Sequence, residues 1–161
     1  MQRGRNTTLG MSFDCFALGL RLALAVLVGG MLGLNRDLHR KPAGVRTHAL
    51  VSLGSAVVTM LIFETTQHEP NALSRVIQGL LTGVGFLGAG VIIHHDMEHR
   101  VEGLTTAASV WMTAILGMAC GAGQGGIVLM GLLLALAVLI FGGPIEHAFA
   151  RWFKARRPPL P

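Results

Sequence analysis

Long apolar blocks alternate with short polar stretches along the chain. An α-helix rises about 1.5 Å per residue, so roughly 20 apolar residues cross the hydrocarbon core of a bilayer. We predict an all-α transmembrane bundle of five helices, with an N-terminal tail at residues 1–15 and a basic C-terminal tail at residues 144–161. The predicted helices cover residues 16–34, 47–63, 75–93, 104–121 and 126–143.

The positions of Lys and Arg predict the orientation of the bundle, because these residues gather in short loops on the cytoplasmic side. With five crossings, nine of the 13 Lys and Arg residues flank the side shared by the first loop, the third loop and the C-terminus. Three flank the opposite side, and Arg21 lies inside the first block. We therefore predict an N-terminus outside the cell and a C-terminus in the cytoplasm.

Composition supports a membrane protein and argues against other classes. Charged residues make up 13% of the chain and hydrophobic residues 52%, whereas a soluble domain has about 25% charged residues. The net charge of +5 does not predict nucleic-acid binding, because the basic residues stand beside apolar blocks rather than on one accessible surface. The expected partner is the lipid bilayer. The two cysteines, Cys15 and Cys120, are not clustered and predict neither a disulfide framework nor a metal site.

Arg21 is a functional candidate because a charge inside a transmembrane helix is costly and is seldom kept without a role. Two interpretations stay open. The side chain either reaches outward to the interface or pairs within the bundle, or it contacts a substrate or partner.

The first loop is the most polar stretch between the predicted helices, and Pro42 and Gly44 predict a fixed turn within it. One interpretation is a positively charged cytoplasmic loop with a single local ion pair made by its one acid. The other is a functional site. The candidate residues are Asn35, Arg36, Asp37, Lys41, Arg46, Thr47 and His48.

The third block contains a glycine-rich segment that fits the dinucleotide-binding pattern G-x-G-x-x-G. That pattern needs a strand before it and a helix after it, whereas here it lies inside a membrane-length apolar run. We expect either a smooth surface for close helix packing or a local break in the helix. Gly29-x3-Gly33 and Gly117-x3-Gly121 add two more small-residue faces. The candidates in the third block are Gly83, Gly85, Gly88 and Gly90.

The fourth predicted helix carries several hydroxyl side chains. Thr105, Ser109 and Thr113 follow an i, i+4, i+8 spacing and are predicted to form one stripe, with Thr106 and Trp111 as neighbouring candidates. The stripe either bonds helices together or lines a small polar cavity.

A zinc-peptidase pattern, H-x-x-E-H, occurs at His95–His99. The two histidines share a face only on a helix, and the segment is predicted to be a short loop with no evident third ligand. We therefore expect solvated histidines, no catalytic residues and no enzyme.

Several motifs, taken in order, resemble the membrane domain of the bacterial MgtC/SapB family over residues 16–141. Two departures accompany the resemblance: Asn35 stands where the family usually has Glu, and Asp37 where it often has Glu. The resemblance ends near residue 141, so we expect no counterpart of the family's cytoplasmic C-terminal domain. The matching segments are Arg21–Leu22, Gly33–Asp37 (resembling G-x-E-R-E), Lys41–His48 (K-P-A-G-x-R-T-H), Gly83–Ile92 and Val101–Trp111.

The resemblance implies a bacterial inner-membrane protein connected with magnesium limitation, stress adaptation and sometimes virulence. It further implies a homodimer and a non-enzymatic regulator of another membrane complex, ATP synthase being the example in the family. A small ion transporter or channel is the alternative hypothesis. The family name points to magnesium, which is also the one cofactor that the resemblance suggests, whereas Arg21 and the basic loop favour an anion.

Overall fold

The computed structural model describes residues 6–65, 70–93 and 103–155, and these residues fold into five α-helices with no strand among them. The predicted all-α bundle is confirmed, and all five helices are long and apolar enough to cross a membrane. The helices are α1 (Asn6–Leu38), α2 (Val45–Thr65), α3 (Pro70–Ile93), α4 (Leu104–Gly121) and α5 (Gly125–Ala155).

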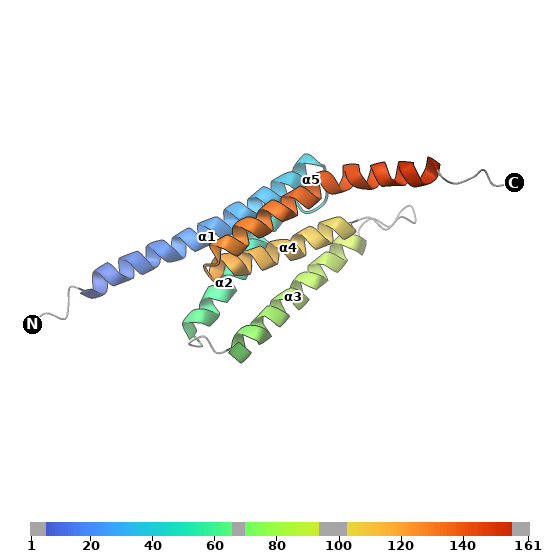
Figure 1. Ribbon diagram of the computed structural model, residues 1–161. Helices are drawn as coiled ribbons and strands as arrows, with labels where there is room; N and C mark the ends of the chain where they lie inside the picture. Colours follow the sequence, from blue (N-terminus) through green and yellow to red (C-terminus); the bar gives the residue numbers. More distant parts are fainter. Residues whose placement is uncertain (1–5, 66–69, 94–102, 156–161) are drawn as a thin grey trace, which may run out of the picture.

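The N-terminal part of α1 and the C-terminal part of α5 extend beyond the bundle at opposite ends (Figure 1). Opposite ends are what an odd number of crossings requires. Which end faces the cytoplasm stays a prediction from the Lys and Arg count. The membrane-length portions are Cys15–Leu38, Val45–Phe63, Asn71–Ile92, Leu104–Gly121 and Gly125–Glu146.

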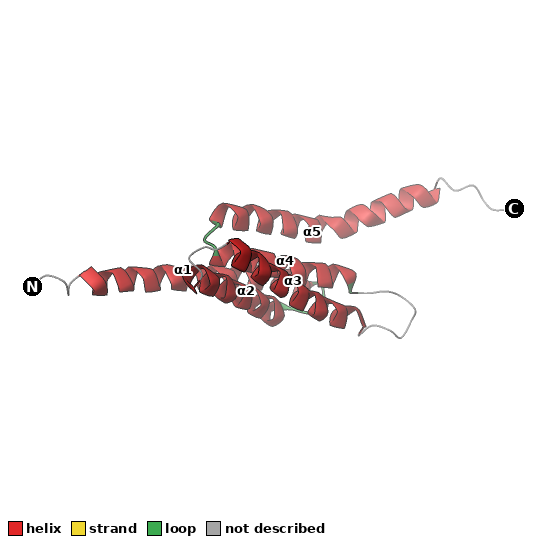
Figure 2. Ribbon diagram, turned by 90° about the horizontal axis from the view of Figure 1, so that it is seen from below, coloured by secondary structure: helices red, strands yellow, loops and turns green. Residues whose placement is uncertain are grey.

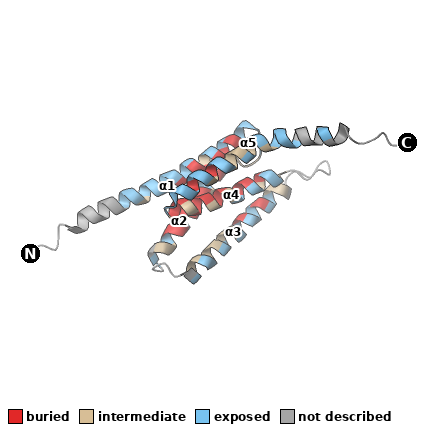
Figure 3. Cartoon of the chain, viewed as in Figure 1, coloured by how far each residue is buried: buried red, intermediate tan, exposed pale blue. Residues whose placement is uncertain are grey.

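Helix α4 lies at the centre of the bundle. Its membrane-length portion is 56% buried, against 11% for both α3 and α5. The buried residues accordingly concentrate where α1, α2 and α4 meet (Figure 3), while α5 lies as an outer layer over the other helices (Figure 2). Helix α5 contributes Val128 and Leu132 to the main apolar core, which it shares with α1, α2 and α4.

Glycines allow α1, α2 and α4 to touch backbone to backbone. A Cβ atom at Gly29 would lie 2.5 Å from the carbonyl oxygen of His48, and one at Gly33 would lie 2.6 Å from Cα of Val45. From α4, a Cβ at Gly117 would overlap the carbonyl oxygen of Ser52. Gly121 approaches the next turn of α2 in the same way. The two small-residue faces predicted on α1 and α4 are therefore both used, and each touches the backbone of α2.

The glycine-rich segment of α3 behaves differently from either expectation. Helix α3 is continuous over Pro70–Ile93, so the segment is not a break. Gly88 alone is close to a neighbouring helix, since a Cβ there would lie 3.3 Å from Cβ of Ala107. Gly83, Gly85 and Gly90 face open space, so within the described chain they do not serve close packing.

Four helices extend beyond their predicted bounds, α1 and α5 by the most, whereas α4 matches its prediction. Helix α1 begins at Asn6 instead of residue 16. Helix α5 continues through Gly142-Gly143-Pro144, where the sequence predicted its end. A proline inside a helix removes one hydrogen bond and bends the axis without ending the helix, and the axis of α5 changes direction along its length in Figure 1.

Candidate functional site

The turn between α1 and α2 is closed by a Schellman motif. The amide of Lys41 donates to the carbonyl of Arg36 (3.0 Å), and the amide of Arg40 donates to that of Asp37 (3.0 Å). Such a motif needs a left-handed residue, which is usually glycine; here it is Arg40, with φ of 52°. The motif ends α1 and turns the chain back toward α2.

Asp37 fixes the start of α2. Its Oδ2 accepts a hydrogen bond of 3.0 Å from the amide of Val45, the first residue of α2. A carboxylate at a helix N-terminus satisfies a free amide and lies favourably in the field of the helix dipole. Gly44 leaves room for this contact, because a Cβ at that position would displace the carboxylate. The acid of the first loop therefore joins two helices through a backbone amide.

Arg36 is buried in the bundle, with 5% of its surface exposed. Its Nη2 donates to Oγ1 of Thr106 on α4 over 2.6 Å. Its Nε has no hydrogen-bond partner among the residues that the structure describes. Among the residues that the structure describes, Arg36 is also the one buried side chain that carries a charge. A fixed positive charge therefore lies where α1 meets α4.

His48 joins α2 to the same turn of α4. Its Nε2 lies 3.1 Å from Oγ of Ser109 and its Nδ1 lies 3.0 Å from the carbonyl oxygen of Gly44. Ser109 Oγ in turn donates to the carbonyl of Thr106 (2.8 Å). Because His48 is completely buried, both ring nitrogens depend on these contacts for hydrogen bonding.

These contacts define a buried polar cluster made by α1, α2 and α4. It lies close to the α1–α2 turn, since Arg36 is in the last turn of α1 and His48 in the first turn of α2. Its members combine one cation, one imidazole and two hydroxyls. The members are Arg36, His48, Thr106 and Ser109. Asn35 precedes Arg36 and is also buried, and its Oδ1 has no partner among the described residues.

A line of hydroxyls continues from the cluster along α2 and α4. Ser55 and Thr59 donate to carbonyls one turn earlier in α2, over 2.8 Å each, and Thr113 donates to the carbonyl of Ser109 over 2.8 Å. Their protons are used within their own helices. Ser52, also buried, has an Oγ without a partner among the described residues.

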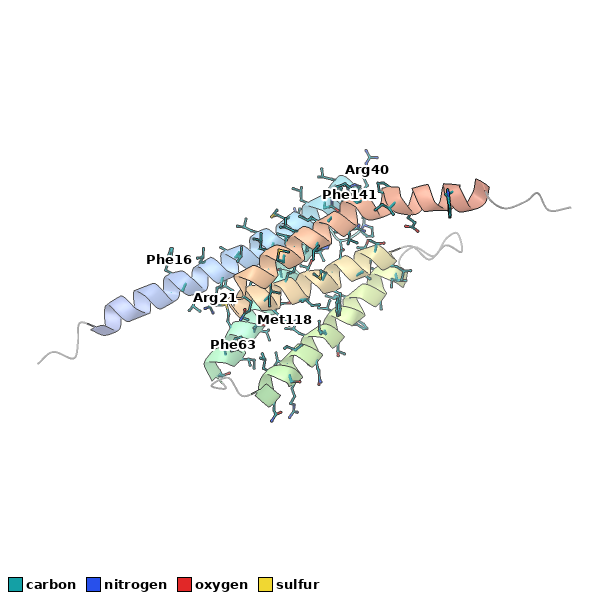
Figure 4. All side chains as sticks on the ribbon, in the orientation of Figure 1. Phe16, Arg21, Arg40, Phe63, Met118 and Phe141 are labelled. Atoms are coloured by element: carbon teal, nitrogen blue, oxygen red, sulfur yellow. The ribbon has the colours of Figure 1, made fainter. Side chains whose placement is uncertain are left out.

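Arg21 lies at the other end of the bundle, beside the α4–α5 turn (Figure 4). Its Nη1 donates to the carbonyl oxygen of Gly121 over 3.3 Å. A Cβ at Gly123, which has φ of 73°, would lie 3.1 Å from Nη2 of the same guanidinium. Of the two interpretations that the sequence left open, this geometry supports pairing within the bundle.

The structure brings some predicted candidates together and separates others. Arg36, His48, Thr106 and Ser109 meet in the cluster, with Asp37 at its edge, and Asn35 is buried next to Arg36 in the sequence. Lys41, Arg46 and Thr47 are exposed, and Trp111 is 45% exposed on the outer surface of α4. The α3 glycines lie outside the cluster, and so does Arg21.

The hydroxyl stripe of α4 is one residue out of the predicted register. Thr105 is exposed and Thr106 is buried, so the buried face reads Thr106, Ser109 and Thr113. The i, i+4, i+8 spacing was wrong at its first position because the face turned toward α1 and α2 follows an i, i+3, i+7 course.

Sequence reasoning missed the hydroxyls of α2. His48, Ser52, Ser55 and Thr59 follow one helix face at i, i+4, i+7 and i+11, a signal that was present in the pattern. The H-x-x-E-H segment lies outside the described residues. Within the described residues, no group of three or more His, Cys, Asp or Glu side chains is placed to hold a metal ion.

Comparison with known proteins gives consistent matches. The model of the MgtC family matches residues 22–148. Protein SrpB of Synechococcus elongatus is 43% identical over 136 residues, which is 78% of this chain and 75% of that protein. Protein MgtC of Salmonella typhimurium is 41% identical over 105 residues, 65% of this chain and 43% of that protein. An uncharacterized protein of Haemophilus influenzae is 37% identical over 110 residues, 64% of this chain.

The chain therefore spans less than half the length of the Salmonella and Haemophilus proteins that it matches. No solved structure matches it.

Proposed function

Because this chain belongs to the MgtC family, we propose that it is a non-enzymatic inner-membrane regulator that helps a bacterium adapt to magnesium limitation. It acts through contacts between its helices and another membrane complex, ATP synthase being one candidate, and works as a homodimer. The N-terminus is outside the cell and the C-terminus is in the cytoplasm. The five membrane-length helices make the chain a multi-pass membrane protein.

One observation supports a regulator over a magnesium transporter. The buried charge at the centre of the polar cluster is the cation Arg36, which repels a divalent cation. Magnesium is usually bound through carboxylates and retained water. No predicted membrane block contains Asp or Glu. The hydroxyls near Arg36 are bonded to their own helices or to His48, as expected of groups that fix helix positions.

The alternative function is a small ion transporter or channel. Arg36 and the hydroxyl line between α2 and α4 favour an anion over magnesium as its substrate. We rank this second, since the hydroxyl protons along that line are engaged in backbone hydrogen bonds.

Flux through the purified protein in liposomes separates the two functions. We expect no movement of magnesium or small anions in either direction. Flux that the wild type supports and that Arg36→Gln abolishes, with helix content retained, overturns the regulator proposal. A cellular assay complements it: growth of a deletion strain at low magnesium should be restored by the wild type and by Thr105→Val, but not by Thr106→Val.

A further inference from the structure

Among the residues that the structure describes, no negative charge balances that of Arg36. A buried charge is stable only when it is paired and hydrogen-bonded. Among the described residues, the guanidinium has one side-chain partner, the neutral hydroxyl of Thr106, and its Nε has none. Arginine presents five N–H donors in a planar fork.

The acids that the structure describes do not serve this guanidinium. Asp37 is exposed, and its Oδ2 binds the amide of Val45. Glu146 is far from Arg36 in the sequence and occupies an exposed position of α5. Neither forms a hydrogen bond or ion pair with Arg36 in the described part of the chain.

The described groups around Arg36 carry no negative charge. The Thr106 hydroxyl accepts from Arg36. Ser109 Oγ donates to the carbonyl of Thr106, and both ring nitrogens of His48 already have partners. The guanidinium is therefore a positive charge with an unused Nε–H donor, which attracts a ligand that carries negative charge and accepts hydrogen bonds. A planar carboxylate or a phosphate has that chemistry, and the arginine fork fits either one through two parallel bonds.

Arg36 is buried, but it lies two residues before the end of α1. The turn that follows carries the exposed side chains of Arg40 and Lys41, so this turn is the short route from water to the guanidinium. An anion reaching it from the turn does not cross the bilayer. The exposed bases raise the local concentration of anions at that end.

We propose that Arg36 and Thr106 form a binding site for a small free oxyanion, of the carboxylate or phosphate class, that enters beside the α1–α2 turn. This site goes beyond the proposed function, because binding requires neither transport nor a protein partner.

The test measures thermal unfolding of the full-length protein in detergent against increasing formate or inorganic phosphate, with chloride holding the ionic strength constant. Binding to the native state raises the unfolding midpoint in a saturable way. We expect saturation for the wild type, a loss of the effect in Arg36→Gln, and an apparent affinity about tenfold weaker in Thr106→Val. Arg21→Gln, at the opposite end, should keep the wild-type affinity.

Two results overturn the proposal. One is a wild type whose midpoint follows ionic strength alone, and the other is saturation that persists in Arg36→Gln. Glu102, which precedes α4 outside the described residues, provides a third test. If Glu102→Gln binds the anion and the wild type does not, then the chain's own acid balances Arg36. Circular dichroism checks that each variant is folded. If Arg36→Gln does not fold, Thr106→Val still tests the site. Flux measurements do not enter, so failure here leaves the regulator proposal standing.

Discussion

The Nη1 atom of Arg21 lies 3.3 Å from the carbonyl oxygen of Gly121, a residue 100 positions further along the chain. The carbonyls of the last helical turn lack partners within the helix and carry partial negative charge. Arg21 therefore supplies to α4 the C-terminal cation that its own last turn lacks. The contact also holds the α4–α5 turn against α1.

Replacing Arg21 by methionine should lower the stability of the bundle by about 1 kcal/mol, because one charged hydrogen bond and a favourable dipole interaction are lost. Arg21→Lys should retain part of that energy, since it keeps the charge. Thermal unfolding in detergent measures both variants. Equal stability of wild type and Arg21→Met would show that the contact contributes nothing.

The glycine contacts of α2 predict a large difference between two chemically identical substitutions. Gly117→Ala introduces a Cβ into the backbone of Ser52, and we expect about 1–3 kcal/mol of destabilisation. Gly83→Ala on α3 meets open space and should be neutral or stabilising by up to about 1 kcal/mol, through the higher helix propensity of alanine. Reversible unfolding of both variants compares the two helices, and similar losses would contradict the packing described for α2.

The register of α4 predicts an asymmetry between adjacent threonines. Thr106→Val removes the hydroxyl that accepts from the buried Arg36 and should cost about 1.5–3 kcal/mol. Thr105→Val alters an exposed position and should change stability by no more than about 0.5 kcal/mol. Chemical denaturation of the two variants decides between the two registers. A larger loss at Thr105 would restore the i, i+4, i+8 stripe.

Helix α4 also ends in a Schellman motif, since the amide of Gln124 donates to the carbonyl of Ala119 (2.9 Å) and the amide of Gly123 to that of Cys120 (3.0 Å). The two motifs predict a stabilising substitution. Arg40 and Gly123 occupy the same left-handed position after α1 and after α4, but a side chain there is strained. Arg40→Gly should therefore stabilise the protein by about 0.5–1 kcal/mol, and Gly123→Ala should destabilise it by at least that amount. The comparison needs only unfolding midpoints. Destabilisation by Arg40→Gly would mean that the Arg40 side chain makes contacts worth more than the strain.

Much of the fold could be predicted from sequence because the bilayer imposes it. In a bilayer, each membrane-length apolar block forms a helix, because its backbone groups must hydrogen-bond within the segment. Hydropathy therefore predicted the five helices and the approximate ends of most of them. The extension of α5 beyond Gly142-Gly143-Pro144 did not. Glycine and proline lower the propensity for helix, but they do not end a helix when the residues beyond continue it.

The candidate site could be predicted only in part. Arg36, His48, Thr106 and Ser109 were candidates by residue type, but their meeting depends on how α1 and α2 are rotated against α4. Periodicity gives the spacing along one helix and not its rotation against a neighbour, which explains the exchange of Thr105 for Thr106. The α3 glycines show the same limit, since a small-residue face in sequence does not reveal whether a helix of the same chain lies against it.

The glycine contacts around α2 also bear on communication between the two faces of the membrane. Where backbones touch directly, no layer of side chains is available to absorb a displacement by changing rotamers. We therefore expect a displacement of the turn held by Arg21 to reach the neighbourhood of Arg36, because the backbones of α1 and α4 both touch that of α2. The more loosely attached α3 and α5 are then the parts that can change place relative to it.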